Sequence, residues 1–198
     1  LIKIQNELVL DRLYSTVPVE ISMGPFLKAK AALGHLEQIS TKNPHLFLES
    51  SPEQKCQIWH HQDELLADQI DYDLTANQVL LHDVTGSLKV NHDKPDASQI
   101  RISSPQIILY REKNSADLIG ESRIDDPAFG LVESKEKLSL FRKATKAGYT
   151  LQQIKATGPF RLTYRPSAKE EVHRFTSTGT FEWDAQKLVI KAQAPKKT

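Results

Sequence analysis

Apolar and aromatic residues recur at every second position in many short segments of this chain. Because successive side chains of a β-strand point to opposite faces, such alternation predicts strands with one buried face. Turn-forming residues separate the segments, as at 73–77 and 113–115. We therefore predict an all-β protein built from short antiparallel strands. The clearest segments are HLFLE (45–49), QIDYD (69–73), QVLLH (78–82) and PFRLTYR (159–165).

Two stretches fit more than one secondary structure. Residues 24–40 (GPFLKAKAALGHLEQIS) are rich in Ala, Leu and Lys, which favours a helix, yet their apolar residues also alternate with lysines. In residues 134–148, Ser134 is typical of a helix start and Gly148 of a helix end. Helix and strand remain open for both stretches, so the β-rich fold could include one short helix.

One short phrase occurs twice in the sequence. IDYD (70–73) and FEWD (181–184) each consist of an apolar residue, an acid, a large aromatic residue and Asp, and an aliphatic run follows each. This order predicts a β-hairpin whose turn is opened by the Asp side chain as a hydrogen-bond acceptor. Either the chain repeats one hairpin unit, or two unrelated hairpins share common β-sheet chemistry.

The charge balance excludes one large class of partners. The 198 residues include 26 basic and 25 acidic side chains, giving a formal net charge of +1. Proteins that bind nucleic acid by neutralising phosphates need a clustered positive field, and the basic residues here are spread along the chain. We therefore expect no nucleic-acid partner.

The sequence gives only partial information about the cellular compartment of the protein. Cys56 is the single cysteine, so no internal disulfide can form. The first residues, LIKIQNELVLDRLY, carry charges where a signal peptide is apolar, and the chain begins at Leu1 rather than Met. We expect that a signal or anchor segment preceded this sequence.

Residues able to support catalysis or metal binding do not converge on a known motif. In WHHQDE (59–64), only His61 and Asp63 would share a strand face and could share a metal, and a third ligand would have to come from elsewhere. Ser134 and Lys137 match a short nucleophile pair, without its accompanying motifs. No phosphate-binding glycine loop or hydrolase motif is present. We expect a non-enzymatic protein without a metal or other cofactor.

The repeated phrase lies in a longer stretch with a recognisable order. LLADQIDYDLTANQVLLHDVTGSLKV (65–90) resembles the signature hairpin of the OstA-like, or LptA-type, family of lipopolysaccharide-transport β-jellyroll proteins. Residues 155–192 are similar to a second copy, in which Trp183 replaces the tyrosine. The positions of the first copy that match the family pattern are Ala67, Asp68, Tyr72, Asp73, Val79, Leu81 and Gly86.

The resemblance implies an elongated, V-shaped antiparallel jellyroll made of degenerate hairpin repeats, with residues 1–198 forming one domain. Its slit would be open at both ends and would shelter the acyl chains of lipopolysaccharide. The residues expected to face the slit are Ile70, Tyr72, Leu74, Val79, Leu81, Phe160, Leu162, Tyr164, Phe181 and Trp183. The alternative is that these residues form a closed, dry core with no ligand.

The family likewise implies a role and a set of partners. The protein would be a periplasmic bridge carrying lipopolysaccharide towards the outer membrane. It would join other transport proteins, or copies of itself head to tail, through exposed edge strands. Alternatives are an LptC-like anchored component, another OstA-like module, or an adhesion and assembly module without a lipid ligand. A hydrolase on a β scaffold is the remaining class.

Overall fold

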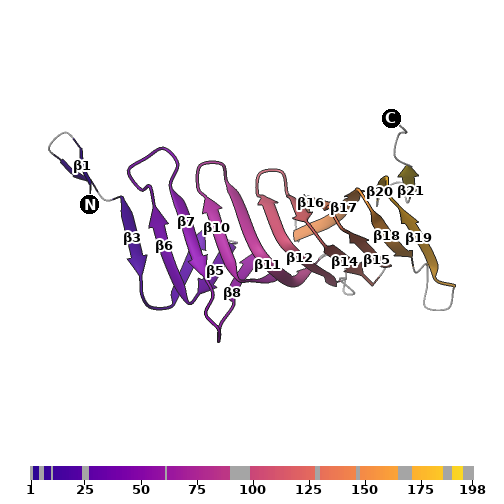
Figure 1. Cartoon of the computed structure of the whole chain (residues 1–198), viewed down its shortest axis with the longest axis horizontal. Helices are drawn as coiled ribbons and strands as arrows, with labels where there is room; N and C mark the ends of the chain where they lie inside the picture. Colours follow the sequence, from indigo (N-terminus) through magenta and orange to yellow (C-terminus); the bar gives the residue numbers. More distant parts are fainter. Residues whose placement is uncertain are drawn as a thin grey trace.

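Strands follow one another along the long axis of the molecule, from β3 (Arg12–Ser15) towards one end to β19 (His173–Ser177) and β21 (Val189–Gln193) towards the other (Figure 1). The computed structural model describes residues 2–4, 7–9, 11–23, 27–60, 62–89, 99–127, 130–145, 148–164, 171–184 and 189–193. Within these ranges no residue is helical, and no helix could cross a membrane. Nineteen strands form one antiparallel network that is not closed into a barrel, which confirms the predicted elongated all-β jellyroll.

The pairings divide this network into two layers. The first layer consists, in spatial order, of β3 (Arg12–Ser15), β6 (Leu33–Glu37), β7 (His45–Glu49), β10 (Gln69–Asp73), β11 (Gln78–Lys89), β12 (Gln99–Tyr110), β13 (Ser115–Ile119), β16 (Lys137–Thr145), β17 (Gly148–Thr157), β20 (Thr180–Asp184) and β21 (Val189–Gln193). The second consists of β4 (Val19–Met23), β5 (Leu27–Ala31), β8 (Cys56–His60), β9 (Asp63–Ala67), the distal parts of β11 and β12, β14 (Ser122–Asp126), β15 (Gly130–Ser134), β18 (Phe160–Tyr164) and β19 (His173–Ser177). β1 (Ile2–Ile4) and β2 (Glu7–Val9) form a separate two-stranded sheet.

The layers join along one long edge, where the chain turns a corner from one layer to the other. β11 bends at Asp83, whose φ of 51° lies in the left-handed region, and β12 bends beside it at Pro105. Backbone hydrogen bonds link successive corners, as from Asp68 N to His82 O at 2.9 Å and from Gly120 N to Glu136 O at 2.8 Å. The turns of the first layer, such as 74–77 and 111–114, therefore lie on the opposite long edge.

Where the structure describes them, both stretches left open by the sequence consist of strands joined by turns and bends, with no helical residue. In β5, Leu27, Ala29 and Ala31 are buried while Lys28 is exposed, so the alternation with lysines describes this segment correctly. Residues 24–26 of the first stretch and 146–147 of the second lie outside the described part of the chain.

At Ser134 the open choice between helix and strand falls to strand, because β15 ends at Ser134 and β16 begins at Lys137. The Ser134 hydroxyl accepts hydrogen bonds from the amides of Glu136 and Lys137, at 3.2 and 3.3 Å. A helix N-cap makes the same contacts, which explains the helix-like sequence signal. Here they form a corner between β15 and β16 instead.

The two repeated phrases form equivalent hairpins, β10–β11 and β20–β21. Tyr72 pairs with Val79, and Trp183 pairs with Ile190. In each hairpin this is the second pair counted from the turn. Asp73 Oδ1 accepts from the amides of Thr75 and Ala76, at 2.8 and 2.7 Å. The prediction that Asp73 opens its turn as an acceptor is confirmed.

Candidate functional site

The inner face of the first layer carries two parallel rows of apolar side chains. One row lies nearer the corners, and cross-strand register links each member to the next. None of its members exceeds 1% exposure, so this deep row is a closed core. The deep row consists of Leu48, Ile70, Leu81, Ile107, Leu118, Leu138, Ala156 and Phe181.

The second row of the first layer lies nearer the turns, and we call it the rim row. Some of its members are buried, but Leu36, Leu46, Leu109 and Trp183 keep part of their surface exposed. The rim row therefore offers apolar surface that the protein itself does not fully cover. It consists of Leu13, Leu36, Leu46, Tyr72, Val79, Leu109, Ala116, Leu140, Ile154 and Trp183.

An apolar row on the second layer runs the same length. It consists of Ile21, Ala29, Ile58, Leu65, Gly86, Ile102, Ile124, Val132, Leu162 and Phe175. At the two ends of the molecule, Leu13 is 57% and Phe175 51% exposed. The apolar lining is thus exposed at both ends.

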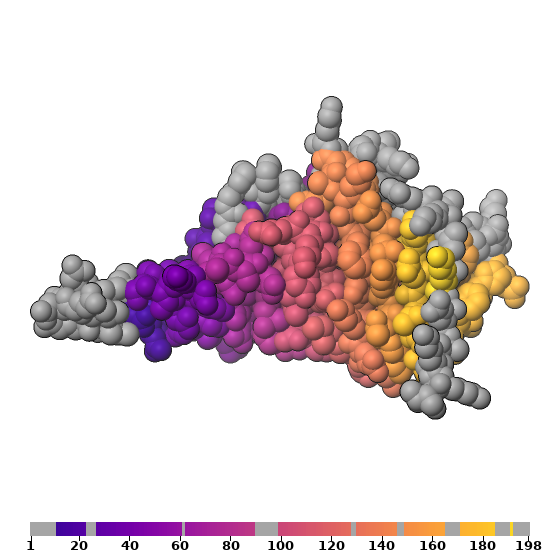
Figure 2. All heavy atoms as spheres, turned by 90° about the horizontal axis from the view of Figure 1, so that it is seen from above, coloured from indigo at the N-terminus to yellow at the C-terminus, as the bar shows by residue number. Residues whose placement is uncertain are grey.

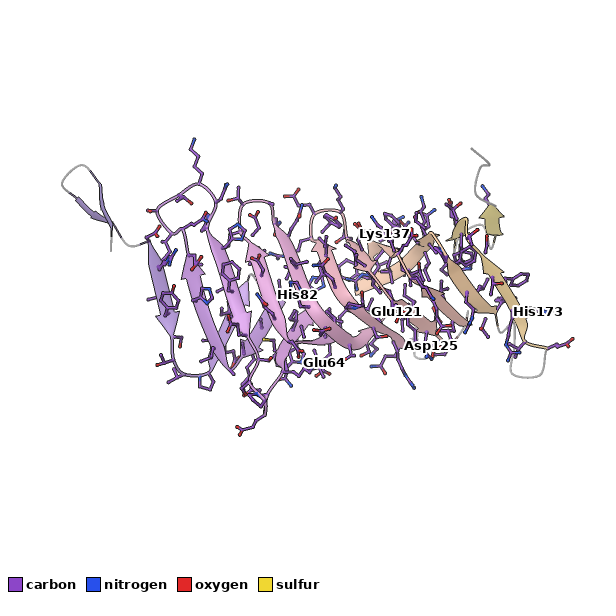
Figure 3. All side chains as sticks on the ribbon, in the orientation of Figure 1. Glu64, His82, Glu121, Asp125, Lys137 and His173 are labelled. Atoms are coloured by element: carbon purple, nitrogen blue, oxygen red, sulfur yellow. The ribbon has the colours of Figure 1, made fainter. Side chains whose placement is uncertain are left out.

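The outward-facing side chains are more polar, as with the labelled residues Glu64 and His82 near mid-length and His173 towards the β19 end of the molecule (Figure 3). The space-filling view shows the strands as consecutive bands along the axis (Figure 2). The protein therefore has an apolar seam between its layers and a polar exterior. This partition suits a ligand with an apolar and a polar part.

A cavity of about 270 Å³ lies between the layers near mid-length. Its apolar walls come from both layers: Leu27, Ile58, Leu65, Val79, Leu88 and Leu109. Its polar lining includes residues of turn 111–114 and of the β16–β17 hairpin. The cavity therefore combines an apolar interior with a polar mouth, as ligand pockets usually do.

Arg111 is the cation on one side of this mouth. Its Nη1 donates to the Tyr72 hydroxyl at 2.7 Å and to Asn77 Oδ1 at 3.0 Å, and its guanidinium lies 5.8 Å from the centre of the Tyr72 ring. The Tyr72 hydroxyl donates in turn to Asn77 Oδ1 at 3.0 Å. Asn77 has a φ of 53°, a conformation that Asn tolerates well in turns. Two neutral groups thus fix the position of the guanidinium.

Arg142 closes another side of the mouth. Its Nη1 forms an ion pair with Asp63, which follows the turn from β8 to β9 in the second layer. The guanidinium also lies 4.6 Å from the centre of the Tyr149 ring, and that ring lies 5.3 Å from the His60 ring. The distal part of the β16–β17 hairpin therefore spans the gap between the layers.

The β16–β17 hairpin reaches Asp63 because its register shifts between Phe141 and Arg142. Phe141 pairs with Gln153 and Arg142 with Leu151, so β17 has one extra residue at this point. Such a β-bulge bends a strand and strengthens its twist. The bulge separates the part of the hairpin that belongs to the first layer from the part that crosses the mouth.

The environment of Asp63 keeps it ionised although the residue is only 3% exposed. Burial alone would raise the pKa of Asp63. Its contacts with His60 and Arg142 outweigh burial and hold that pKa below its ordinary value. The Lys89 amide donates to Asp63 Oδ1 at 2.9 Å and acts in the same direction. The ion pair with Arg142 is therefore maintained at neutral pH.

The structure distributes the predicted slit residues over several environments. Ile70, Leu81 and Phe181 lie in the deep row; Tyr72, Val79 and Trp183 lie in the rim row; Leu162 lies in the row of the second layer. Phe160 is buried, with its ring 5.4 Å from that of Phe181, and Tyr164 is partly buried. Leu74 lies in the turn after β10 and is 42% exposed, away from the strand face that it was expected to share.

Sequence reasoning missed Arg111 and Arg142. Arg111 belongs to a turn whose composition indicates only that it is charged, and Arg142 lies in the segment considered as a helix. Their shared location at the mouth depends on pairing between distant strands, which no local pattern encodes. Leu109, beside the turn, could have been found by its alternation with Ile107.

Comparison with known proteins does not identify a family for this chain. The sequence matches no protein-family model and no curated protein.

No metal site is evident in the described residues, which contain no group of three His, Cys, Asp or Glu placed to hold an ion. His61, considered above with Asp63, lies outside the described part of the chain. Ser134 uses its hydroxyl at a corner of the fold.

Proposed function

We propose that this protein is a non-enzymatic carrier that holds the acyl chains of lipopolysaccharide between its layers. In this proposal it works in the periplasm, without a cofactor, on the route to the outer membrane. The single observation that carries the proposal is the pair of apolar rows that run from Leu13 to Trp183 and from Ile21 to Phe175. The resemblance of residues 65–90 to the OstA-like hairpin supports the choice of lipid.

The physical basis is the transfer of methylene groups out of water. Each methylene buried against apolar walls contributes about 0.8 kcal/mol, so even part of an acyl chain gains useful affinity. The partly exposed members of the rim row, such as Leu109 and Leu46, provide that surface. Sugars and phosphates would remain at the polar edge, where desolvation costs least.

Edge strands supply the proposed partner contacts. Among the described residues, β3 pairs only with β6, and β21 only with β20, so each keeps one edge available. Unpaired strand edges readily add a strand from another chain. We propose that other lipopolysaccharide-transport proteins, or further copies of this chain, join head to tail at these ends.

A pair of substitutions on β12 tests the lipid-binding role. Leu109 faces the cavity and its neighbour Ile108 faces outward, opposite Leu80 and Asp117. Leu109→Asp places an unpaired charge on the apolar wall, so lipopolysaccharide binding should weaken by about tenfold or more. Ile108→Asp adds the same charge to the other face of the same strand and should change affinity by less than about twofold.

Binding would be measured with purified lipopolysaccharide, and circular dichroism would check that both variants keep their strands. Equal affinities for a folded Leu109→Asp protein and the wild type would contradict the proposal.

A second candidate is an assembly module that binds protein rather than lipid. A row of rings on the outer face favours it: Tyr14 and His35 stack at 5.2 Å, and His35 and Phe47 at 4.8 Å. Tyr14 is 59% exposed, and exposed aromatic residues are common at protein interfaces. If both β12 variants bind lipopolysaccharide as the wild type does, this candidate takes precedence.

A further inference from the structure

The two arginines at the cavity mouth differ in how their charges are compensated. Arg142 is held by the buried carboxylate of Asp63. Arg111 contacts only the Tyr72 hydroxyl and the Asn77 amide, both neutral. In the described part of the chain, no carboxylate lies within ion-pair distance of its guanidinium. Within the described residues, the Arg111 guanidinium is therefore held in place by hydrogen bonds but has no carboxylate counter-ion.

The hydrogen-bonding capacity of Arg111 is also only partly used. A guanidinium has five N–H donors in a planar fork, which matches the oxygens of a carboxylate or phosphate. Within the described residues both hydrogen bonds of Arg111 come from Nη1, so Nε and Nη2 have no protein acceptor there. The remaining donors are available to an oxyanion.

The apolar part of the cavity lies directly behind this cation. Val79 and Leu109, which pair across β11 and β12, line the same cavity as Arg111. A volume of about 270 Å³ is near the lower end of small-molecule pockets, which begin at roughly 300 Å³. The cavity thus suits one apolar chain with an anionic group at its end.

We propose that Arg111 binds the oxyanion head, phosphate or carboxylate, of an acyl amphiphile whose chain enters this cavity. This inference rests on the proposed lipid-binding function of the slit and adds the group that orients the ligand. Tyr72 and Asn77 hold the guanidinium in advance, so little side-chain freedom is lost on binding. Arg142 does not compete for the head group, because Asp63 neutralises it.

Glu112 provides a contrast next to Arg111. It is exposed and also lines the cavity, so its negative charge opposes an incoming anion. Replacing it with glutamine removes that repulsion without adding an apolar group. An anionic amphiphile should therefore bind more tightly to the Glu112→Gln protein than to the wild type.

Calorimetric titration with three probes of equal chain length tests the assignment. The probes are dodecyl phosphate, dodecanoate and a nonionic dodecyl ether, each kept below its critical micelle concentration. The proteins are the wild type, Arg111→Gln, Arg111→Lys, Glu112→Gln and the control Arg123→Gln. Arg123 is paired with Asp125 on β14 and lies outside this cavity.

The wild type should bind the anionic probes about tenfold more tightly than the nonionic one. Arg111→Gln should abolish that difference and leave nonionic binding unchanged, Arg111→Lys should retain part of it, and Arg123→Gln should retain all of it. A preference confined to dodecyl phosphate would identify a lipid phosphate as the head group, whereas a preference for both anions would identify oxyanions in general.

The result that overturns the assignment is an Arg111→Gln protein that still prefers the anionic probes, or a wild type with no preference. In either case the proposed function of the slit survives if the nonionic probe binds. If none of the probes binds the wild type, the proposed function and this inference fail together.

Discussion

Arg142 and Asp63 form an ion pair between residues 79 positions apart in the sequence. The pair joins the β16–β17 hairpin to the second layer across the mouth of the cavity. Both side chains are largely buried, so the contact differs from the exposed pair of Arg123 and Asp125. It fixes the separation of the layers where the cavity lies.

Replacing Arg142 with alanine should destabilise the protein strongly. The change leaves Asp63 as a buried carboxylate without its main counter-ion, which typically costs about 3 kcal/mol of unfolding free energy. Arg123→Ala removes one member of an exposed pair and should cost less than about 1 kcal/mol. Urea unfolding at pH 7 compares the two variants, and equal losses would refute the structural role of the Arg142 pair.

The same pair predicts how stability depends on pH. The pKa of Asp63 is lower in the folded protein than in the unfolded chain, where it is about 3.9. The stabilisation is therefore complete above the unfolded value and is lost as the pH falls through the folded value. The difference in unfolding free energy between the wild type and Asp63→Asn should shrink as the pH is lowered from about 5 to 3. A difference that is constant over this range would argue against the lowered pKa.

Gly86 should not tolerate a side chain. A Cβ at this position would lie 2.3 Å from the carbonyl oxygen of Glu64 and 2.8 Å from Leu65 Cα, both backbone atoms of β9. Gly86→Ala should lower the unfolding free energy by about 1–3 kcal/mol, because β9 and β11 would have to separate. At Gly34 the nearest atom, at 2.9 Å, is the end of the Leu48 side chain rather than backbone, so Gly34→Ala is the milder control. Thermal unfolding of both variants would show whether this order holds.

The exposed ends predict self-association. Leu13 ends the rim row on the edge strand β3 and is 57% exposed. The average mass in sedimentation velocity should rise with protein concentration, and Leu13→Lys should reduce that rise because charged residues protect strand edges. A wild-type protein that stays monomeric at all concentrations would count against the head-to-tail contact, though not against the slit.

Alternation in the sequence was sufficient to predict the faces of the clearest strands. Ile70, Tyr72, Val79 and Leu81 all point into the space between the layers, because a strand of period two fixes the side of each residue once one is assigned. Alternation did not predict how deeply each inward-facing residue is buried between the layers. Leu81 lies in the closed deep row, whereas Leu109 lines the cavity, and that difference depends on distance from the corners.

Other features depend on contacts that sequence patterns do not record. Leu74 continues the alternation of β10 by parity, but the turn opened by Asp73 carries it out of the strand. The Ser134 hydroxyl makes cap-like hydrogen bonds in a corner between strands, so its local sequence fits a helix start as well as a corner and leaves the element open. The ion pair of Arg142 with Asp63 requires the whole pairing order of the network.

Site-specific photo-crosslinking along the rim row would determine whether lipid occupies the slit. A benzophenone side chain would replace Leu36, Leu109 or Trp183, three partly exposed inward positions near the start, middle and end of the row. The controls His35, Ile108 and Glu182 are their neighbours on the same strands and face outward. With lipopolysaccharide present, the account predicts adducts at the three inward positions and few at the outward ones. Equal capture on both faces, or capture on the outer face alone, would contradict it.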